Sequence, residues 1–200
     1  MANKSVGAKA MVDSTGLSVS GWRNREVSLS LADSDRPTVL EFRGGWFTSQ
    51  YRLQPLETGE NEESLGPVLA TVMGRESNRF VLNKPYTRFR ISRFSTRGNS
   101  VTHGPWHLRV VPLDELTPLR TLTQGKHGDL LFHSGRSVTV EFAWHGHAGG
   151  ALYFQGLADK NEWQLTGHQA LRGTTTIPRK GLLRVEGYGR WQLKMKPSGS

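Results

Sequence analysis

The sequence contains no cysteine, and this absence excludes several kinds of chemistry. Without thiols the chain has no disulfide framework, no thiolate metal site and no cysteine nucleophile. The absence is compatible with a reducing compartment. Any metal site would have to be built from histidine and carboxylate side chains.

Long apolar runs and helical periodicity are missing as well. No segment approaches the roughly 18 consecutive apolar residues of a membrane span. Met1–Gly16 carries lysines but no apolar segment of the kind found in signal peptides. We therefore expect a cytoplasmic protein, or a component of a particle assembled in the cytoplasm. No stretch of about 10–12 residues has a convincing 3.6-residue period, so we expect few or no helices.

Acidic residues are outnumbered, with 17 Asp and Glu against 26 Lys and Arg, and the formal net charge is +9. Such an excess favours anionic partners, namely nucleic acid, an acidic membrane surface or an acidic protein, although it also serves solubility. Hydrophobic residues make up 36% of the chain. The core must therefore draw on the six Trp and eight Phe, whose large rings each bury on the order of 150–250 Å².

Strand patterns dominate what is present. Val27–Leu31, Thr38–Phe42 and Val138–Trp144 alternate apolar and polar residues, as half-buried strands do. The 23 Gly and 9 Pro suit a fold with many turns. The sequence therefore predicts a nearly all-β protein.

Three short matches occur in the same order in the two halves of the chain. Val39–Phe42 matches Thr139–Phe142, and Phe89-Arg90-Ile91 matches Leu183-Arg184-Val185. A Trp-x-Leu-basic segment ends each half, at residues 106–109 and 191–194. The offsets are 100, 94 and 85 residues. Ordered matches of this kind indicate a duplicated structural unit.

We predict two tandem antiparallel β-sandwich units, jelly-roll-like and related by an internal repeat, with a single large sandwich or barrel as the alternative. The tryptophan, leucine and phenylalanine residues of the matched segments are expected to face inward between two sheets. The expected divisions are a flexible arm at 1–15, a first unit at 16–113, a linker at 114–125, a second unit at 126–197 and a tail at 198–200.

The G-x-W-x-L closing strand at Gly104–Leu108 and Gly189–Leu193 is accompanied by an apolar-Arg-apolar strand. Gly128-Asp129-Leu130-Leu131 adds a G-D-x-L opening. Together these motifs resemble small β-sandwich modules common in actinobacterial proteins, which are often tandem and have no assigned activity. The resemblance covers most of the second half and, less closely, residues 38–113. It implies a binding or assembly module and supplies no catalytic residues.

A basic stretch in the first half is the main candidate for a binding surface. Its cations are interleaved with aromatic residues, as in surfaces that contact phosphates and stack bases. The same cations could dock an acidic protein, including the Glu57–Glu63 loop of a second copy, which would produce a homo-oligomer through head-to-tail contacts. The candidate anion-binding or partner-binding residues are Arg75, Arg79, Lys84, Arg88, Arg90, Arg93, Arg97 and Arg109.

His145-Gly146-His147 is the most enzyme-like element, because two histidines with this spacing at a strand end can bind a metal. Ala151 and Leu152 stand where such a site needs a carboxylate, so a polar loop is the simpler interpretation and no metal or cofactor is expected. Glu41 and Glu141 occupy matching repeat positions. Cross-strand ion pairs with Arg90, Arg184, Arg109 and Lys194 explain them better than paired catalytic carboxylates.

No phosphate-binding glycine loop, G-x-S-x-G elbow or dinucleotide fingerprint is found. The leading hypothesis is thus a non-catalytic binding or assembly protein that self-associates or docks an acidic protein through a basic face. One alternative is a polyanion-binding protein that takes nucleic acid. The other is a metal-dependent enzyme or carbohydrate-binding module that uses His145 and His147.

Overall fold

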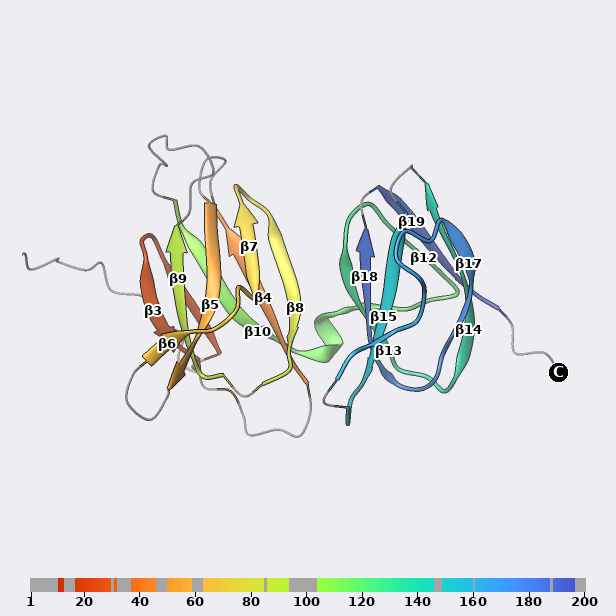
Figure 1. Cartoon of the computed structure of the whole chain (residues 1–200), viewed down its shortest axis with the longest axis horizontal. Coiled ribbons are helices and arrows are strands. Elements are labelled where there is room, and N and C mark those ends of the chain that lie inside the picture. Colours follow the sequence, from red (N-terminus) through yellow and green to blue (C-terminus); the bar gives the residue numbers. More distant parts are fainter. Residues whose placement is uncertain are drawn as a thin grey trace, which may run out of the picture. The chain divides into compact units, whose positions relative to one another are not determined.

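A computed structural model of the chain describes residues 11–12, 17–29, 31, 37–45, 50–58, 63–84, 86–93, 104–145, 149–159, 161–187 and 189–196. Apart from residues 35–37, the boundary between two compact units falls between Val111 and Pro112. Among the described residues the one helical element is a short 3-10 helix, η1 (Leu113–Glu115), and none has the length and apolarity to cross a bilayer. The remaining regular elements are strands (Figure 1), which confirms the all-β prediction.

The strands of the first unit are β1 (Met11–Val12), β2 (Ser18–Gly21), β3 (Arg25–Ser28), β4 (Thr38–Gly44), β5 (Gln50–Thr58), β6 (Glu63–Leu65), β7 (Ala70–Met73), β8 (Ser77–Leu82), β9 (Arg88–Arg93) and β10 (Trp106–Val111). They form two antiparallel sheets. One sheet has the order β1-β2-β10-β4-β8, and the other has the order β3-β9-β5-β6 with β7 also paired to β5.

The strands of the second unit are β11 (Thr117–Pro118), β12 (Leu122–Gly125), β13 (Asp129–His133), β14 (Val138–His145), β15 (Gly150–Gly156), β16 (Trp163–Gln164), β17 (Arg172–Ile177), β18 (Gly181–Gly187) and β19 (Arg190–Met195). One sheet has the order β12-β19-β14-β17, and the other has the order β11-β13-β18-β15-β16. All pairs are antiparallel except β11 with β13.

The two units share one strand order, that of a jelly roll. The sheet β2-β10-β4-β8 corresponds to β12-β19-β14-β17, and the sheet β3-β9-β5 corresponds to β13-β18-β15. In each unit the last strand pairs with both the second and the fourth strand, β10 with β2 and β4 and β19 with β12 and β14, and this order is typical of a jelly roll. The predicted tandem jelly-roll-like units are confirmed.

Residues 114–125 are not the linker that the sequence predicted, because they contribute two strands to the second unit. β11 pairs with β13, and β12 pairs with β19. Leu116, Leu119 and Thr123 are buried. Turn-like composition concealed these short strands, whose pairing partners lie far along the chain.

The internal repeat is visible in the strand register. Leu108 lies opposite Phe42 where β10 pairs with β4. Leu193 lies opposite Phe142 where β19 pairs with β14. All four side chains are buried, and each pair belongs to the core of its own unit. The predicted inward rows are therefore correct, and the three matched segments occupy equivalent strands.

In each unit a tryptophan of the closing strand packs its ring on a glycine of the neighbouring strand. We call this arrangement the tryptophan seat. Trp106 lies opposite Gly21, and Trp191 lies opposite Gly125. At either glycine an added Cβ would lie 2.3 Å from the ring. The indole N–H donates to the carbonyl oxygen two residues beyond the glycine, at 2.9 Å in the first unit and 2.6 Å in the second. Both rings are almost fully buried. The same packing device therefore ends both halves.

In each unit one large aromatic ring spans the space between the two sheets, at the same level of the sandwich. The ring comes from one sheet in the first unit and from the opposite sheet in the second. In the first unit Tyr51 of β5 reaches across and donates its hydroxyl to the Gly104 carbonyl oxygen, at 2.6 Å. In the second unit Trp144 of β14 reaches across instead and packs on Gly150 of β15, where an added Cβ would lie 2.2 Å from its Nε1. The repeat registers place Gly44 where Trp144 stands, and Gly150 where Tyr51 stands.

The tryptophan seat predicts that a single methyl group added at Gly125 lowers the stability of the protein. Gly125→Ala should lower the free energy of unfolding by about 1–3 kcal/mol, because the methyl group would overlap the buried Trp191 ring. Urea unfolding followed by circular dichroism measures the change. Gly167→Ala is the matched control, since an added Cβ there meets no atom within 4 Å. Equal effects of the two substitutions would contradict the packing described for Trp191.

Candidate anion-binding face

The predicted basic residues of the first unit are divided between its two sheets. Arg79 and Arg109 lie in the sheet that contains β4, on β8 and β10. Arg88, Arg90 and Arg93 lie on β9 of the other sheet. The remaining candidates are Arg75 in the turn between β7 and β8, Lys84 just after β8, and Arg97, which is outside the described residues.

Glu41 neutralises two of these cations. Its carboxylate accepts a hydrogen bond from Arg109 Nε at 2.7 Å and another from Ser77 Oγ at 2.6 Å, while Arg79 Nε lies 3.7 Å away. Burial alone would raise the pKa of Glu41, but these hydrogen bonds and the two guanidinium charges hold it below its ordinary value. The group is therefore an internal ion cluster.

Other candidate cations also have carboxylate partners. Arg88 and Arg90 both contact Glu26, the first at 3.5 Å. Lys84 Nζ lies 4.0 Å from Glu57 and over the ring of Tyr86. This part of the chain consequently presents fewer unneutralised charges than its sequence suggests.

Glu41 and Glu141 both form ion pairs, as predicted, but some of the predicted partners are wrong. Glu41 does pair with Arg109, but Glu141 pairs with Lys196 at 3.0 Å. Arg90 and Arg184 cannot serve, because β9 and β18 belong to the opposite sheets. Alternation alone does not tell which sheet a strand joins.

The histidines that could form a metal site are dispersed among the described residues. His145 is exposed at the end of β14, and His147 falls outside the described residues. His133 is buried and contacts the Arg136 carbonyl oxygen at 2.6 Å. In the described ranges no three His, Asp or Glu side chains converge as metal ligands would.

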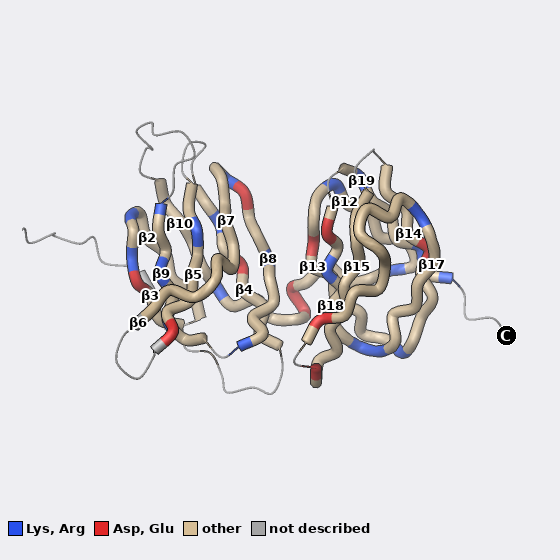
Figure 2. Tube along the Cα trace, viewed as in Figure 1, with Lys and Arg blue, Asp and Glu red and all other residues tan. Residues whose placement is uncertain are grey.

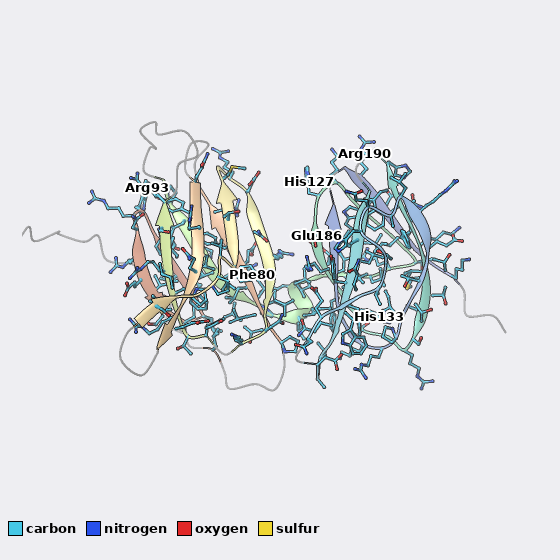
Figure 3. The ribbon with its side chains drawn as sticks, in the orientation of Figure 1. Phe80, Arg93, His127, His133, Glu186 and Arg190 are labelled. Atoms are coloured by element: carbon cyan, nitrogen blue, oxygen red, sulfur yellow. The ribbon has the colours of Figure 1, made fainter. Side chains whose placement is uncertain are left out.

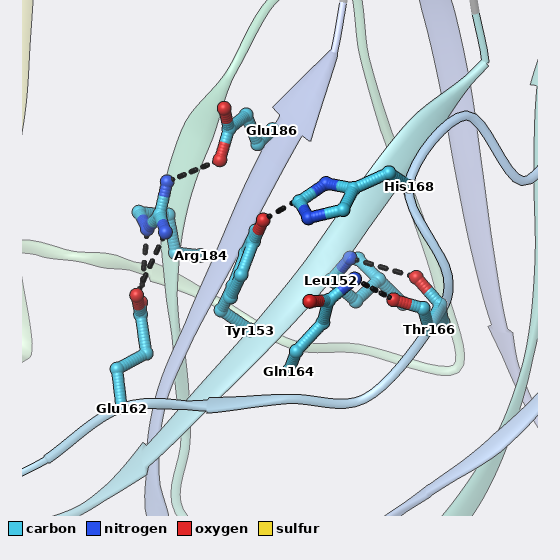
Figure 4. A network of polar contacts seen from close by, with 8 residues as sticks. All are labelled: Leu152, Tyr153, Glu162, Gln164, Thr166, His168, Arg184 and Glu186. Atoms are coloured by element: carbon cyan, nitrogen blue, oxygen red, sulfur yellow. Dashed lines mark hydrogen bonds and ion pairs between the residues drawn. The ribbon is translucent and has the colours of Figure 1, made fainter.

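A polar network covers the sheet formed by β18, β15 and β16 (Figure 4). Arg184 makes two hydrogen bonds to Glu162, at 2.9 and 2.7 Å, and one to Glu186 at 2.6 Å. Its guanidinium lies 4.1 Å from the ring centre of Tyr153, whose hydroxyl lies 3.3 Å from His168 Nδ1. The network joins β18 and β15 to the segment that carries Glu162 and His168.

Protonation in this network does not resemble that of a catalytic site. Hydrogen bonds to Glu162 hold the pKa of Arg184 above its already high ordinary value. Burial raises the pKa of Tyr153, so its hydroxyl stays protonated. Both carboxylates are committed to Arg184 and neither is left as a base. We interpret the network as structural.

A cationic face lies on the outer side of the sheet β12-β19-β14-β17 in the second unit. Alternation along β19 sends Trp191 and Leu193 into the core and their neighbours outward. The register aligns outward residues in rows, such as Arg190 beside His145. The exposed basic residues of this cationic face are Lys126, His145, Arg172, Arg190, Lys194 and Lys196.

The charge of the cationic face is largely unneutralised. Glu141 is the one carboxylate among its described outward residues, and it pairs with Lys196. No described carboxylate lies within ion-pair distance of Lys126, Arg172 or Arg190. In Figure 2 basic segments lie along the β14, β17 and β19 part of this unit. The face therefore combines rigid strands with positive charge available to a partner.

The equivalent face of the first unit is built differently. There Glu41 occupies the centre between two arginines, and Ser20 Oγ contacts His107 Nδ1 at 2.7 Å. The longer basic stretch of the first unit is the more conspicuous feature of the sequence, and the face of the second unit was not predicted. The signal was present in the closing strand, where the alternate outward positions are Arg190, Gln192, Lys194 and Lys196.

Neither a known family model nor a curated protein matches the chain. Among solved structures, the CUB1-EGF-CUB2 domain of human MASP-1/3 is 9% identical, with a TM-score of 0.26, and the match covers 90% of this chain and 100% of that one. The CUB1-EGF-CUB2 domains of rat MASP-1 are 10% identical, with a TM-score of 0.27 and coverage of 89% and 97%. Similarity this low says nothing about activity or partners.

The Glu41 cluster predicts a pH-dependent contribution to stability. Because the pKa of Glu41 is lowered on folding, its contribution is present above about pH 4.5 and is lost as the pH falls through the folded-state value. Glu41→Gln should cost about 1–3 kcal/mol at pH 7, since charged hydrogen bonds are lost in a mostly buried site. The cost should shrink as the pH falls below about 4.5 in urea unfolding experiments.

Glu141→Gln is the matched control at the equivalent repeat position. Its side chain is 46% exposed and has one lysine partner, so the expected cost is below about 1 kcal/mol. A cost for Glu41→Gln that is independent of pH would contradict the cluster.

Proposed function

We propose that the chain is a non-catalytic binding protein that docks an acidic protein partner through the cationic face of its second unit. The observation that carries the proposal is a row of exposed cations on adjacent, hydrogen-bonded strands, of which only Lys196 has an ion-pair partner among the residues that the structure describes. Complementary charge of this kind accelerates association and selects among partners. The jelly-roll scaffold holds the charges at fixed spacing.

Most side chains between the cations are short or polar, and the exposed Leu122 lies beside Lys194. Ala143, Thr174 and Thr176 occupy outward positions on β14 and β17. Gln124 and Gln192 add amide groups that accept and donate hydrogen bonds. A partner can therefore approach the strands closely and place carboxylates against the longer basic side chains.

An acidic protein fits this face better than the other polyanions or a second copy. The described outward residues include no Trp, Tyr or Phe, on which single-stranded nucleic acid would stack. Two copies that each carry a formal charge of +9 repel one another at low ionic strength. Light scattering at high micromolar protein concentration tests self-association directly.

The proposal predicts the effect of removing two charges from the face. Arg172→Gln with Lys194→Gln should weaken binding of a fluorescent glutamate-rich peptide by about tenfold at low salt, because neither cation has an ion-pair partner among the described residues. Fluorescence anisotropy measures the dissociation constant. Circular dichroism checks that the variant keeps its strand content.

Arg43→Gln with Arg136→Gln removes the same charge from exposed positions elsewhere and serves as the control. This variant should bind the peptide within about twofold of the unaltered protein. If the two double variants bind alike, net charge alone explains the interaction and the proposed face is wrong. If a duplex oligonucleotide binds more tightly than the peptide and loses affinity steeply with salt, the partner is nucleic acid instead.

A further inference from the structure

A cavity of about 600 Å³ opens at one end of the cationic face. It lies where β12 and β14 end and β19 begins, and every lining residue belongs to the second unit. Figure 3 shows Arg190 and His127 at this end of the unit. The lining residues are Gln124, Gly125, Lys126, His145, Arg190, Trp191 and Gln192.

The walls of the cavity are held by the strand register. Arg190 pairs with His145, and Gln124 pairs with Gln192. Gln124 Nε2 donates to Gln192 Oε1 at 3.3 Å, which leaves the amide nitrogen of Gln192 as a further donor. Strand positions of this kind keep polar groups in place before a ligand arrives.

Two of the lining residues, Gly125 and Trp191, belong to the tryptophan seat. Gly125 has no side chain above the Trp191 ring, and any larger residue would overlap that ring. The ring is itself fixed, because its N–H donates to the His127 carbonyl oxygen. Core packing therefore holds this part of the cavity lining in place.

The charge of the cavity has one sign. Lys126 and Arg190 are exposed, and no described carboxylate lies within ion-pair distance of either. None of the lining residues is acidic. The group that completes these contacts is therefore expected to be an anion.

The first unit supplies an internal comparison. The repeat register places Trp22, Pro105 and Gly45 where Lys126, Arg190 and His145 stand in the second unit. The same fold thus forms without cations at these positions. Neither the jelly roll nor the tryptophan seat explains why the second unit has them.

We infer that the cavity binds a small organic ligand that carries a phosphate or sulfate group. Arginine contacts two oxygens of such a group at once, lysine adds a point charge, and the glutamine amide donates to a remaining oxygen. The cavity volume is within the range of small-molecule sites and exceeds that of a single oxyanion, so it leaves room for the rest of the ligand. The cavity shares Lys126, His145 and Arg190 with the cationic face, but the inference does not require that a protein partner docks there.

The test uses the full chain labelled with ¹⁵N and titrated with inorganic phosphate, sulfate, acetate and phenyl phosphate. Phosphate and sulfate should produce saturable shifts at the Gln124, Gly125 and His145 amides and at the Trp191 indole. Acetate should bind more weakly, and phenyl phosphate should bind more tightly than inorganic phosphate. Lys126→Gln with Arg190→Gln should weaken phosphate binding about tenfold or more, since two charge-assisted contacts are lost.

Arg43→Gln with Arg136→Gln is the charge-matched control and should leave phosphate binding within about twofold. Both substituted cavity residues are exposed, so urea unfolding should show unchanged stability. The absence of saturable shifts, or equal weakening by the two double variants, would overturn the inference. Phenyl phosphate that binds no more tightly than inorganic phosphate would overturn the claim of an organic ligand.

The variant pairs also separate this site from the docking face. Arg172→Gln with Lys194→Gln should weaken peptide binding and leave phosphate binding within about twofold. A peptide that fails to bind while phosphate still saturates the cavity would reject the proposed function alone. Phosphate that fails while the peptide binds would reject the cavity alone.

Discussion

Alternation along the closing strand is the constraint on which each unit depends. β10 and β19 lie between two neighbours in their sheets, so one side of each strand must fill the core. The tryptophan and leucine on that side are equivalent in both units and almost fully buried. The other side faces solvent and is free of packing requirements. Differences between the units consequently collect there.

The two outer faces show how this freedom has been used. In the first unit Glu41 lies between Arg79 and Arg109 and satisfies their charges internally. In the second unit the ion-pair partner of Glu141 among the described residues is Lys196, at the end of the row. Buried or half-buried ion clusters hold strands in register, whereas unneutralised cations are available for association. One scaffold thus carries an internally neutralised version and a largely unneutralised version of the same face.

Much of the fold could be predicted because strand alternation and repeat order are local properties of the sequence. The inward rows of Phe142, Leu193 and their equivalents followed directly from a period of two. The short strands within 114–125 did not, since two to four residues carry too little pattern and their partners are distant. The sequence also did not predict which sheet of its own unit holds Arg90 or Arg184, because strand pairing decides to which sheet a strand belongs.

The candidate binding face was harder to predict than the fold for a related reason. A run of cations such as Arg88, Arg90 and Arg93 stands out in the sequence, but folding brings Glu26 beside two of them. Lys126, His145 and Arg190 are separated in the sequence and meet only through the register of three strands. Charge density along the sequence therefore overestimates the available charge where folding pairs cations with carboxylates. It also overlooks cations that are distant in the sequence and come together in the fold.

The exchange of Tyr51 for Trp144 has a consequence for how a tandem repeat reaches its native state. Two similar units in one chain risk mispairing, in which a strand of one unit enters the sandwich of the other. A hybrid core with β14 and β5 would bring Trp144 and Tyr51 to one level, and one with β4 and β15 would bring two glycines together. The first is overfilled and the second leaves a void. Reversed placement of a single ring thus discriminates correct from crossed folding of the two halves.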